Sequence, residues 1–175
     1  LIGNVIISLL TAWVIMVITY CETNHLIDVF RTDSSLQADK LSRLTFLYAG
    51  FAFIISLIRE VIKDMEDVEG DRKYGCKTMP IVMGLNATKV FVAVWLTVLI
   101  ATLVLVQFYV LQFGWWFWLS ALYCLATIIV PLIKIFNLLI AAQTTNQFHK
   151  ISSLVKIVML MGILSMLFFY FIPTK

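Results

Sequence analysis

Long apolar stretches alternate with short polar ones along this chain. Each apolar stretch is close to the roughly 20 residues that an α-helix needs to cross a bilayer core of about 30 Å. Runs such as VFVAVWLTVLIATLVLVQFYVL are continuously apolar and lack the apolar–polar alternation of membrane β-barrel strands. The pattern therefore predicts an all-α, multi-span transmembrane bundle with five helices, at about residues 1–20, 41–60, 88–110, 115–136 and 153–172.

Composition agrees with lipid as the solvent of this chain. Hydrophobic residues make up 62% of the 175 residues and charged residues only 13%, against roughly 25% charged residues in soluble domains. The net charge is +3, and the aromatic residues lie in apolar runs instead of alternating with Lys and Arg. Nucleic-acid binding is therefore not expected.

The distribution of basic residues predicts the orientation in the membrane. Placing the acidic segment that follows the second span in the cytoplasm puts nine Lys and Arg residues on that side and four on the other, as the positive-inside rule requires. The polar segment 21–40 is then an external loop with a short amphipathic turn. The cytoplasmic set is Arg59, Lys63, Arg72, Lys73, Lys77, Lys89, Lys134, Lys150 and Lys156.

Acidic residues gather in one segment, REVIKDMEDVEGDRKYG. Six of the ten Asp and Glu residues fall between Glu60 and Asp71. If the second helix continues through this segment, four carboxylates fall within about 60° of one another on its surface, whereas Glu66 and Glu69 point toward water. The four on the shared stripe are Glu60, Asp64, Asp67 and Asp71.

A one-sided carboxylate stripe needs compensation. Like charges about 6 Å apart at an effective dielectric constant near 20 repel by roughly 3 kcal/mol per pair. Nearby cations can relieve this repulsion, and so can Mg²⁺, which binds one or two protein carboxylates together with substrate phosphate. An ordinary mixed-charge helix at the membrane surface would look similar, and the residues alone leave both interpretations open. Turns at three glycines can bring basic residues back over the stripe, the candidates being Arg72, Lys73 and Lys77.

The amino-acid sequence of this acidic segment resembles that of a known protein family. REVIKDMEDVEGDRKYGCKTMPIVMG is similar to the second aspartate-rich region of the UbiA superfamily of intramembrane prenyltransferases, in the branch containing digeranylgeranylglyceryl phosphate synthases. The opening IGNVIISLLTA and the late FHKISSLVKIVMLMGIL resemble that family's fifth and last transmembrane helices. The resemblance implies a nine-helix fold of which residues 1–175 form helices five to nine, with a cytoplasmic cap loop at about 68–86.

The resemblance also implies an activity and residue roles. It implies Mg²⁺-dependent transfer of a prenyl group from an isoprenyl diphosphate to a lipophilic acceptor, such as geranylgeranylglyceryl phosphate or a related alcohol. Asp67 and Asp71 would hold Mg²⁺, and Asp64 and Glu60 would assist at the same metal site. The catalytic residues would be Asp67, Asp71 and Lys63. The diphosphate would be neutralised by Arg59, Lys63, Arg72 and Lys77.

Two further residues are weaker candidates. Lys156 is expected near the start of the last helix, where it would reach an acceptor phosphate or simply snorkel to the interface. His149 is expected in a cytoplasmic loop that could form part of a lid.

The chain departs from the family in one respect. An earlier Asn/Asp-rich region of the form NDxxDxxxD has no counterpart here, so the chain is expected to be a portion of a longer protein and inactive alone. An aromatic acceptor of the quinone or tocopherol type remains an alternative. A CDP-alcohol phosphotransferase is disfavoured because its DG and AR pairs are missing, and a non-enzymatic membrane subunit because the other four predicted spans contain no acidic residue.

Overall fold

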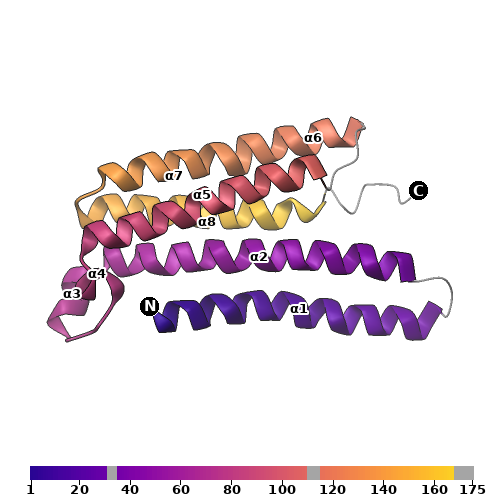
Figure 1. Cartoon of the computed structure of the whole chain (residues 1–175), viewed down its shortest axis with the longest axis horizontal. Helices are drawn as coiled ribbons and strands as arrows, with labels where there is room; N and C mark the ends of the chain where they lie inside the picture. The colour runs from indigo at the N-terminus through magenta and orange to yellow at the C-terminus, as the bar shows by residue number, and fades with distance from the viewer. Residues whose placement is uncertain (31–34, 110–114, 168–175) are drawn as a thin grey trace. The chain divides into compact units, whose positions relative to one another are not determined.

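The computed structural model describes the backbone of residues 1–30, 35–109 and 115–167, and their side chains except for 23–41 and 109–117. All regular structure in these ranges is helical (Figure 1). The elements are α1 (Ile2–Phe30), α2 (Ser35–Glu66), α3 (Val68–Lys73), α4 (Met79–Val82), α5 (Leu85–Tyr109), α6 (Trp115–Cys124), the π-helical turn η1 (Leu125–Ile129), α7 (Val130–Ala141) and α8 (Thr145–Leu164).

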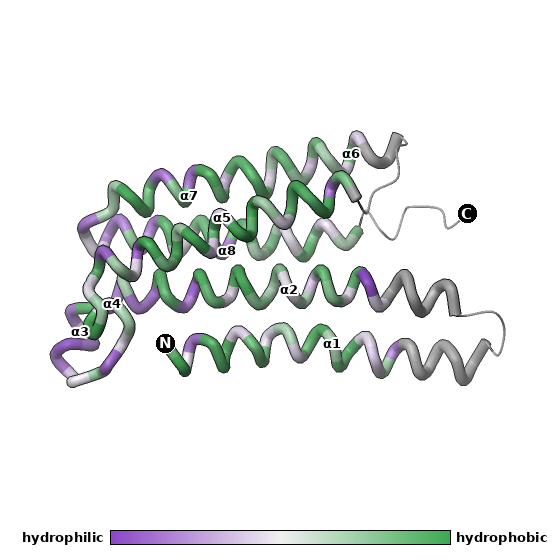
Figure 2. The backbone as a smooth tube through the Cα atoms, viewed as in Figure 1, coloured by the Kyte–Doolittle hydropathy of each residue, from purple (hydrophilic) through white to green (hydrophobic). Residues whose placement is uncertain are grey.

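Five helices within the described residues are long and apolar enough to cross a membrane. They cover Ile2–Glu22, Ser42–Glu66, Leu85–Phe108, Trp118–Ala141 and Thr145–Leu164. Their number and order confirm the prediction of an all-α, five-span chain. Figure 2 shows the hydrophobic colouring along these helices and the hydrophilic colouring at α3.

Several predicted boundaries were wrong. α1 extends to Phe30 and α2 begins at Ser35, so most of the predicted external loop at 21–40 is helical. The last helix begins at Thr145, eight residues before the predicted start at 153. The short gap between the third and fourth predicted spans also predicts a tight turn near residues 112–114, which lie outside the described residues.

The chain divides into two compact units, residues 1–57 and 58–175. In the first unit, α1 and the first part of α2 run side by side (Figure 1). The Thr45 hydroxyl donates to the Thr19 hydroxyl at 3.0 Å, and Thr19 in turn donates to the carbonyl oxygen of Ile15. Each hydroxyl therefore has a partner within the pair, as polar groups in an apolar environment require.

The second unit is built around α5, α7 and α8. α7 packs against both α5 and α8, and the buried side chains include Leu96, Leu132, Ile135 and Val155, each fully enclosed. α8 contributes an apolar face with approximately heptad spacing, formed by Phe148, Ile151, Val155, Val158 and Gly162.

A local feature explains how α6 and α7 form one membrane-length helix despite a proline. Pro131 has no N–H group, so it cannot make the usual hydrogen bond to the carbonyl four residues earlier. Just before it, the Val130 N–H bonds to the Leu125 carbonyl, one residue further back than in an α-helix. The Thr127 hydroxyl donates to the Tyr123 carbonyl at 2.8 Å. The π-helical turn therefore accommodates the proline without ending the span.

Candidate functional site

The last turns of α2 present one fully buried face. Ile58, Val61, Ile62 and Met65 are each at most 1% exposed. Counted from Ile58, they occupy positions i, i+3, i+4 and i+7, which lie on a single helical face. This packing fixes the axis of α2 in the second unit up to the point where the acidic segment begins.

α2 ends at Glu66 and the chain bends at Asp67. Asp67 has φ −93° and ψ 8°, and α3 follows from Val68. The hydrogen bonds Asp67 N–H to Lys63 O and Asp71 N–H to Asp67 O are nevertheless both 2.9 Å long. The predicted unbroken helix through Asp71 was therefore wrong at this one residue, although the one-turn spacing between Asp67 and Asp71 is kept.

The predicted metal ligands lie in different environments. Asp67 is exposed and Asp71 is half-buried, and Asp67 makes no side-chain hydrogen bond to the start of α3. Asp64 is half-buried and has an interaction partner. In the described part of the chain no three His, Cys, Asp or Glu side chains come together as a metal-binding group.

That arrangement fits Mg²⁺ in its usual mode of binding. Mg²⁺ takes one or two protein carboxylates and completes its octahedron with water and substrate phosphate oxygens. Two carboxylates one turn apart, one of them exposed, suit this mode. The structure itself leaves the assignment of Asp67 and Asp71 as a prediction.

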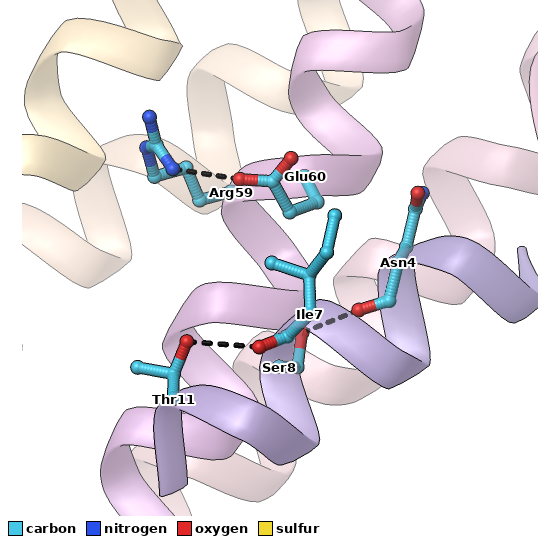
Figure 3. A network of polar contacts seen from close by, with 6 residues as sticks. All are labelled: Asn4, Ile7, Ser8, Thr11, Arg59 and Glu60. Atoms are coloured by element: carbon cyan, nitrogen blue, oxygen red, sulfur yellow. Dashed lines mark hydrogen bonds and ion pairs between the residues drawn. The ribbon is translucent and has the colours of Figure 1, made fainter. Parts of the chain in front are cut away.

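Glu60 and Arg59 form an ion pair. Arg59 Nη1 donates to Glu60 Oε1 at 2.6 Å (Figure 3), with side chains 33% and 16% exposed. The pair neutralises the first carboxylate of the predicted stripe. Glu60 as a metal ligand and Arg59 as a diphosphate ligand would each have to share or give up this contact.

The chain after α3 reverses at Gly75. The Cys76 N–H bonds to the Asp71 carbonyl at 2.9 Å, and the Gly75 N–H bonds to the Arg72 carbonyl at 3.3 Å. These two bonds form a Schellman motif, which needs a left-handed residue, and Gly75 has φ +72°. The predicted diphosphate-binding residues Arg72 and Lys77 flank this turn and are exposed, as is Lys63 on the last turn of α2.

Glu66 does not point toward water as predicted. Its Oε1 lies 2.6 Å from Nδ1 of His149 on α8, and its side chain is only 19% exposed. The sequence contained a signal for this partly buried position of Glu66. Glu66 comes four residues after the buried Ile62 and one residue after the buried Met65, which places it at the edge of the buried face.

The positions predicted for His149 and Lys156 also need correction. His149 lies in the second turn of α8 and not in a loop, and Lys156 lies in the middle of that helix and not near its start. The missed signal is a capping box: Thr144 is the N-cap and Gln147 the third helical residue. Gln147 Oε1 accepts the Thr144 N–H at 3.0 Å, which anchors the start of α8.

Lys89, near the start of α5, was counted in the sequence only as a cytoplasmic charge. Its ammonium group donates to the carbonyl oxygen of Ala142, at the C-terminal end of α7. It also lies 5.9 Å from the centre of the Phe148 ring. A cation at a helix C-terminus is stabilising, so Lys89 fixes the α7–α8 connection.

A cleft of about 380 Å³ lies beside the acidic segment. Its lining combines apolar residues (Met65, Val68, Leu85 and Phe148) with polar ones (Glu69, Gln143, Thr144, Thr145 and Asn146). In the described part of the chain its lining contains neither the four stripe carboxylates nor any Lys or Arg. Because the described residues give the cleft no cationic side chain, it is unsuited to binding a diphosphate.

Comparison with known proteins gives a family for this chain. Residues 1–154 match the UbiA prenyltransferase family. A digeranylgeranylglyceryl phosphate synthase of Methanosphaera stadtmanae is 36% identical over 124 residues, which cover 70% of this chain and 43% of the relative. The synthase of the same name from Methanospirillum hungatei is 29% identical over 84% of this chain and 44% of the relative.

A third relative with that name, from Methanopyrus kandleri, is 33% identical over 66% of this chain and 40% of its own length. The chain thus spans less than half the length of these curated relatives. No solved structure is significantly similar to it.

Proposed function

Because this chain belongs to the UbiA prenyltransferase family, a family of integral membrane proteins, we propose that the protein transfers a prenyl group from an isoprenyl diphosphate to a lipophilic acceptor within the membrane. The observation that supports this most directly is the position of Asp67 and Asp71. They follow directly after a membrane-length helix, one turn apart, with Asp67 exposed. A diphosphate head group at the membrane surface would meet them there while its chain stays in lipid.

The reaction we propose breaks the prenyl C1–oxygen bond and the acceptor O–H bond, and it forms a carbon–oxygen bond between acceptor and prenyl group. The bond between the prenyl C1 and the diphosphate oxygen breaks, and the electron pair leaves with the diphosphate. The acceptor hydroxyl oxygen then forms a carbon–oxygen bond to C1, and its proton passes to the departing diphosphate or to water, which gives an ether and free diphosphate. Charge develops on the departing diphosphate, so cationic groups aimed at it would accelerate the step.

The chain offers those cationic groups on both sides of the carboxylates. Lys63 lies one turn before Asp67, and Arg72 and Lys77 lie after it, all three exposed. We propose that they bind the leaving diphosphate as it gains charge. Mg²⁺, when held by Asp67 and Asp71 with help from Asp64, would add Lewis-acid stabilisation of the same oxygens.

An alcohol is the acceptor that we favour. Three relatives are digeranylgeranylglyceryl phosphate synthases, and we propose geranylgeranylglyceryl phosphate, or a closely related lipid alcohol, for this protein. An aromatic acceptor would use the same diphosphate chemistry but would give a carbon–carbon bond.

Membranes containing the complete protein test this proposal. They would be incubated with radiolabelled geranylgeranyl diphosphate, geranylgeranylglyceryl phosphate and Mg²⁺, and the lipid products identified by mass spectrometry. We expect an ether product that EDTA abolishes and that excess Mg²⁺ restores. A product only with aromatic acceptors would overturn the acceptor assignment, and no transfer to either class would overturn the activity.

A further inference from the structure

The Glu66–His149 hydrogen bond joins the acidic segment to the last helix. The two residues are 83 positions apart in the chain, and Glu66 Oε1 lies 2.6 Å from His149 Nδ1. Since a carboxylate can only accept hydrogen bonds, Nδ1 must carry the hydrogen, whether the imidazole is neutral or charged. The contact therefore fixes the ring orientation of His149 as well as the carboxylate.

Both Glu66 and His149 have buried side chains close to them in sequence. Glu66 follows Ile62 and Met65, which are at most 1% exposed, and His149 lies between the buried Phe148 and Ile151. The Phe148 ring is in turn covered by Lys89, which also bonds to Ala142 O at the end of α7. α8 thus provides a rigid anchor to which the end of α2 is tied.

The Glu66–His149 contact lies immediately before the bend at Asp67. Glu66 is the last residue of α2, and the next residue, Asp67, has the non-helical ψ of 8°. Two hydrogen bonds then continue the segment from Lys63 through Asp67 to Asp71. Loss of the contact at Glu66 would free the bend to change direction and would move Asp67 and Asp71 together.

The contact also orients the Glu66 carboxylate, whose Oε1 lies 2.6 Å from His149 Nδ1. With His149 in place, Glu66 is occupied and turned toward α8.

We infer that His149 is a positioning residue: through its contact with Glu66 it fixes the bend that aims Asp67 and Asp71 at the metal–diphosphate head group. This inference rests on the proposed function for the identity of that head group. The geometric part, the fixing of the segment, does not depend on catalysis and can be measured separately.

Trypsin offers the first measurement, because Arg72, Lys73 and Lys77 are exposed cleavage sites just beyond the bend. In the complete protein in detergent, we expect His149→Ala to speed cleavage at these three sites at least threefold. Cleavage after Lys134 and Lys156, within helices, reports general unfolding and should not change. His149→Gln, which keeps an N–H donor, should stay near wild type, and Lys150→Gln serves as the matched exposed control on α8.

The second measurement is the Mg²⁺ concentration that gives half-maximal prenyl transfer. We expect His149→Ala and Glu66→Ala each to raise it about three- to tenfold, and the double variant to raise it no further, since both remove one contact. Unchanged cleavage together with unchanged Mg²⁺ dependence in His149→Ala would overturn the inference. Faster cleavage in a protein whose wild type transfers no prenyl group would support the positioning role and overturn the proposed function instead.

Discussion

Arg59 Nη1 lies 2.6 Å from Glu60 Oε1, and this ion pair separates Glu60 from the other acidic residues of its stripe (Figure 3). Neighbouring residues on a helix normally point in different directions, so the contact requires the long Arg59 side chain to turn back along the helix. The stripe that looks uniform in the sequence thus contains a neutralised carboxylate at Glu60 and an exposed carboxylate at Asp67.

This contrast predicts different metal dependence for the carboxylates. We expect Asp67→Asn and Asp71→Asn to lower Mg²⁺-dependent prenyl transfer at least about 100-fold, the effect typical of losing a group that stabilises developing charge. Glu69→Gln, an exposed acid of the same segment that lies off the stripe, is the matched control and should retain activity within about twofold of wild type. Near-normal turnover in either Asn variant would remove these aspartates from the metal site.

Glu60→Gln tests the role of the ion pair. If Arg59 holds Glu60 away from the metal, this variant should leave the half-saturating Mg²⁺ concentration within about twofold of wild type. A shift as large as that of Asp67→Asn would instead make Glu60 a metal ligand. The measurement is a Mg²⁺ titration of the initial rate, with Arg59→Gln analysed in parallel.

Gly75→Ala should weaken the turn after α3. The left-handed φ of +72° costs a residue with a Cβ roughly 1–2 kcal/mol, even though the added methyl group would meet no atom within 4 Å. Hydrogen exchange of the Cys76 amide, which bonds to Asp71 O, should become about ten times faster.

Gly70→Ala is the matched control for that experiment. Gly70 lies within α3, has equally open surroundings and no positive φ, so alanine should stabilise the helix by about 0.5–1 kcal/mol. Faster exchange of the Cys76 amide in Gly70→Ala but not in Gly75→Ala would contradict the assigned turn.

Lys89→Met should destabilise the connection between α7 and α8. The variant keeps most of the aliphatic stem but removes the donor to Ala142 O and the cation near Phe148. The expected loss is about 1–2 kcal/mol, as for a cation at a helix C-terminus in a partly buried setting. Thermal unfolding in detergent measures it, and Lys134→Met, an exposed lysine on α7, should leave the midpoint within about one degree.

Hydropathy along the chain was enough to predict the number, type and order of the membrane helices. Uninterrupted apolar runs of bilayer length admit no other regular structure in lipid, and the structure has helices in all five predicted places. The acidic segment and its basic neighbours were also evident, because they are close together in the chain.

Helix ends and the bend were predicted less well, since single local interactions decide them. The capping box at Thr144 and Gln147 begins α8 eight residues earlier than hydropathy indicated. At Asp67 the φ and ψ of a single residue leave the helical range and end α2 while the hydrogen bonds continue, and a uniform helical wheel cannot represent this.

The pairing of charged side chains, by contrast, depends on how the helices pack. Glu66 and His149 meet although they lie 83 residues apart in the chain, and Lys89 reaches Ala142 because α5 packs against α7. Hydropathy fixes which residues lie in lipid, but it does not fix the rotation of one helix against another. The partner of each polar side chain follows from that rotation, and so does the distinction between a carboxylate held by a neighbour and one open to a ligand.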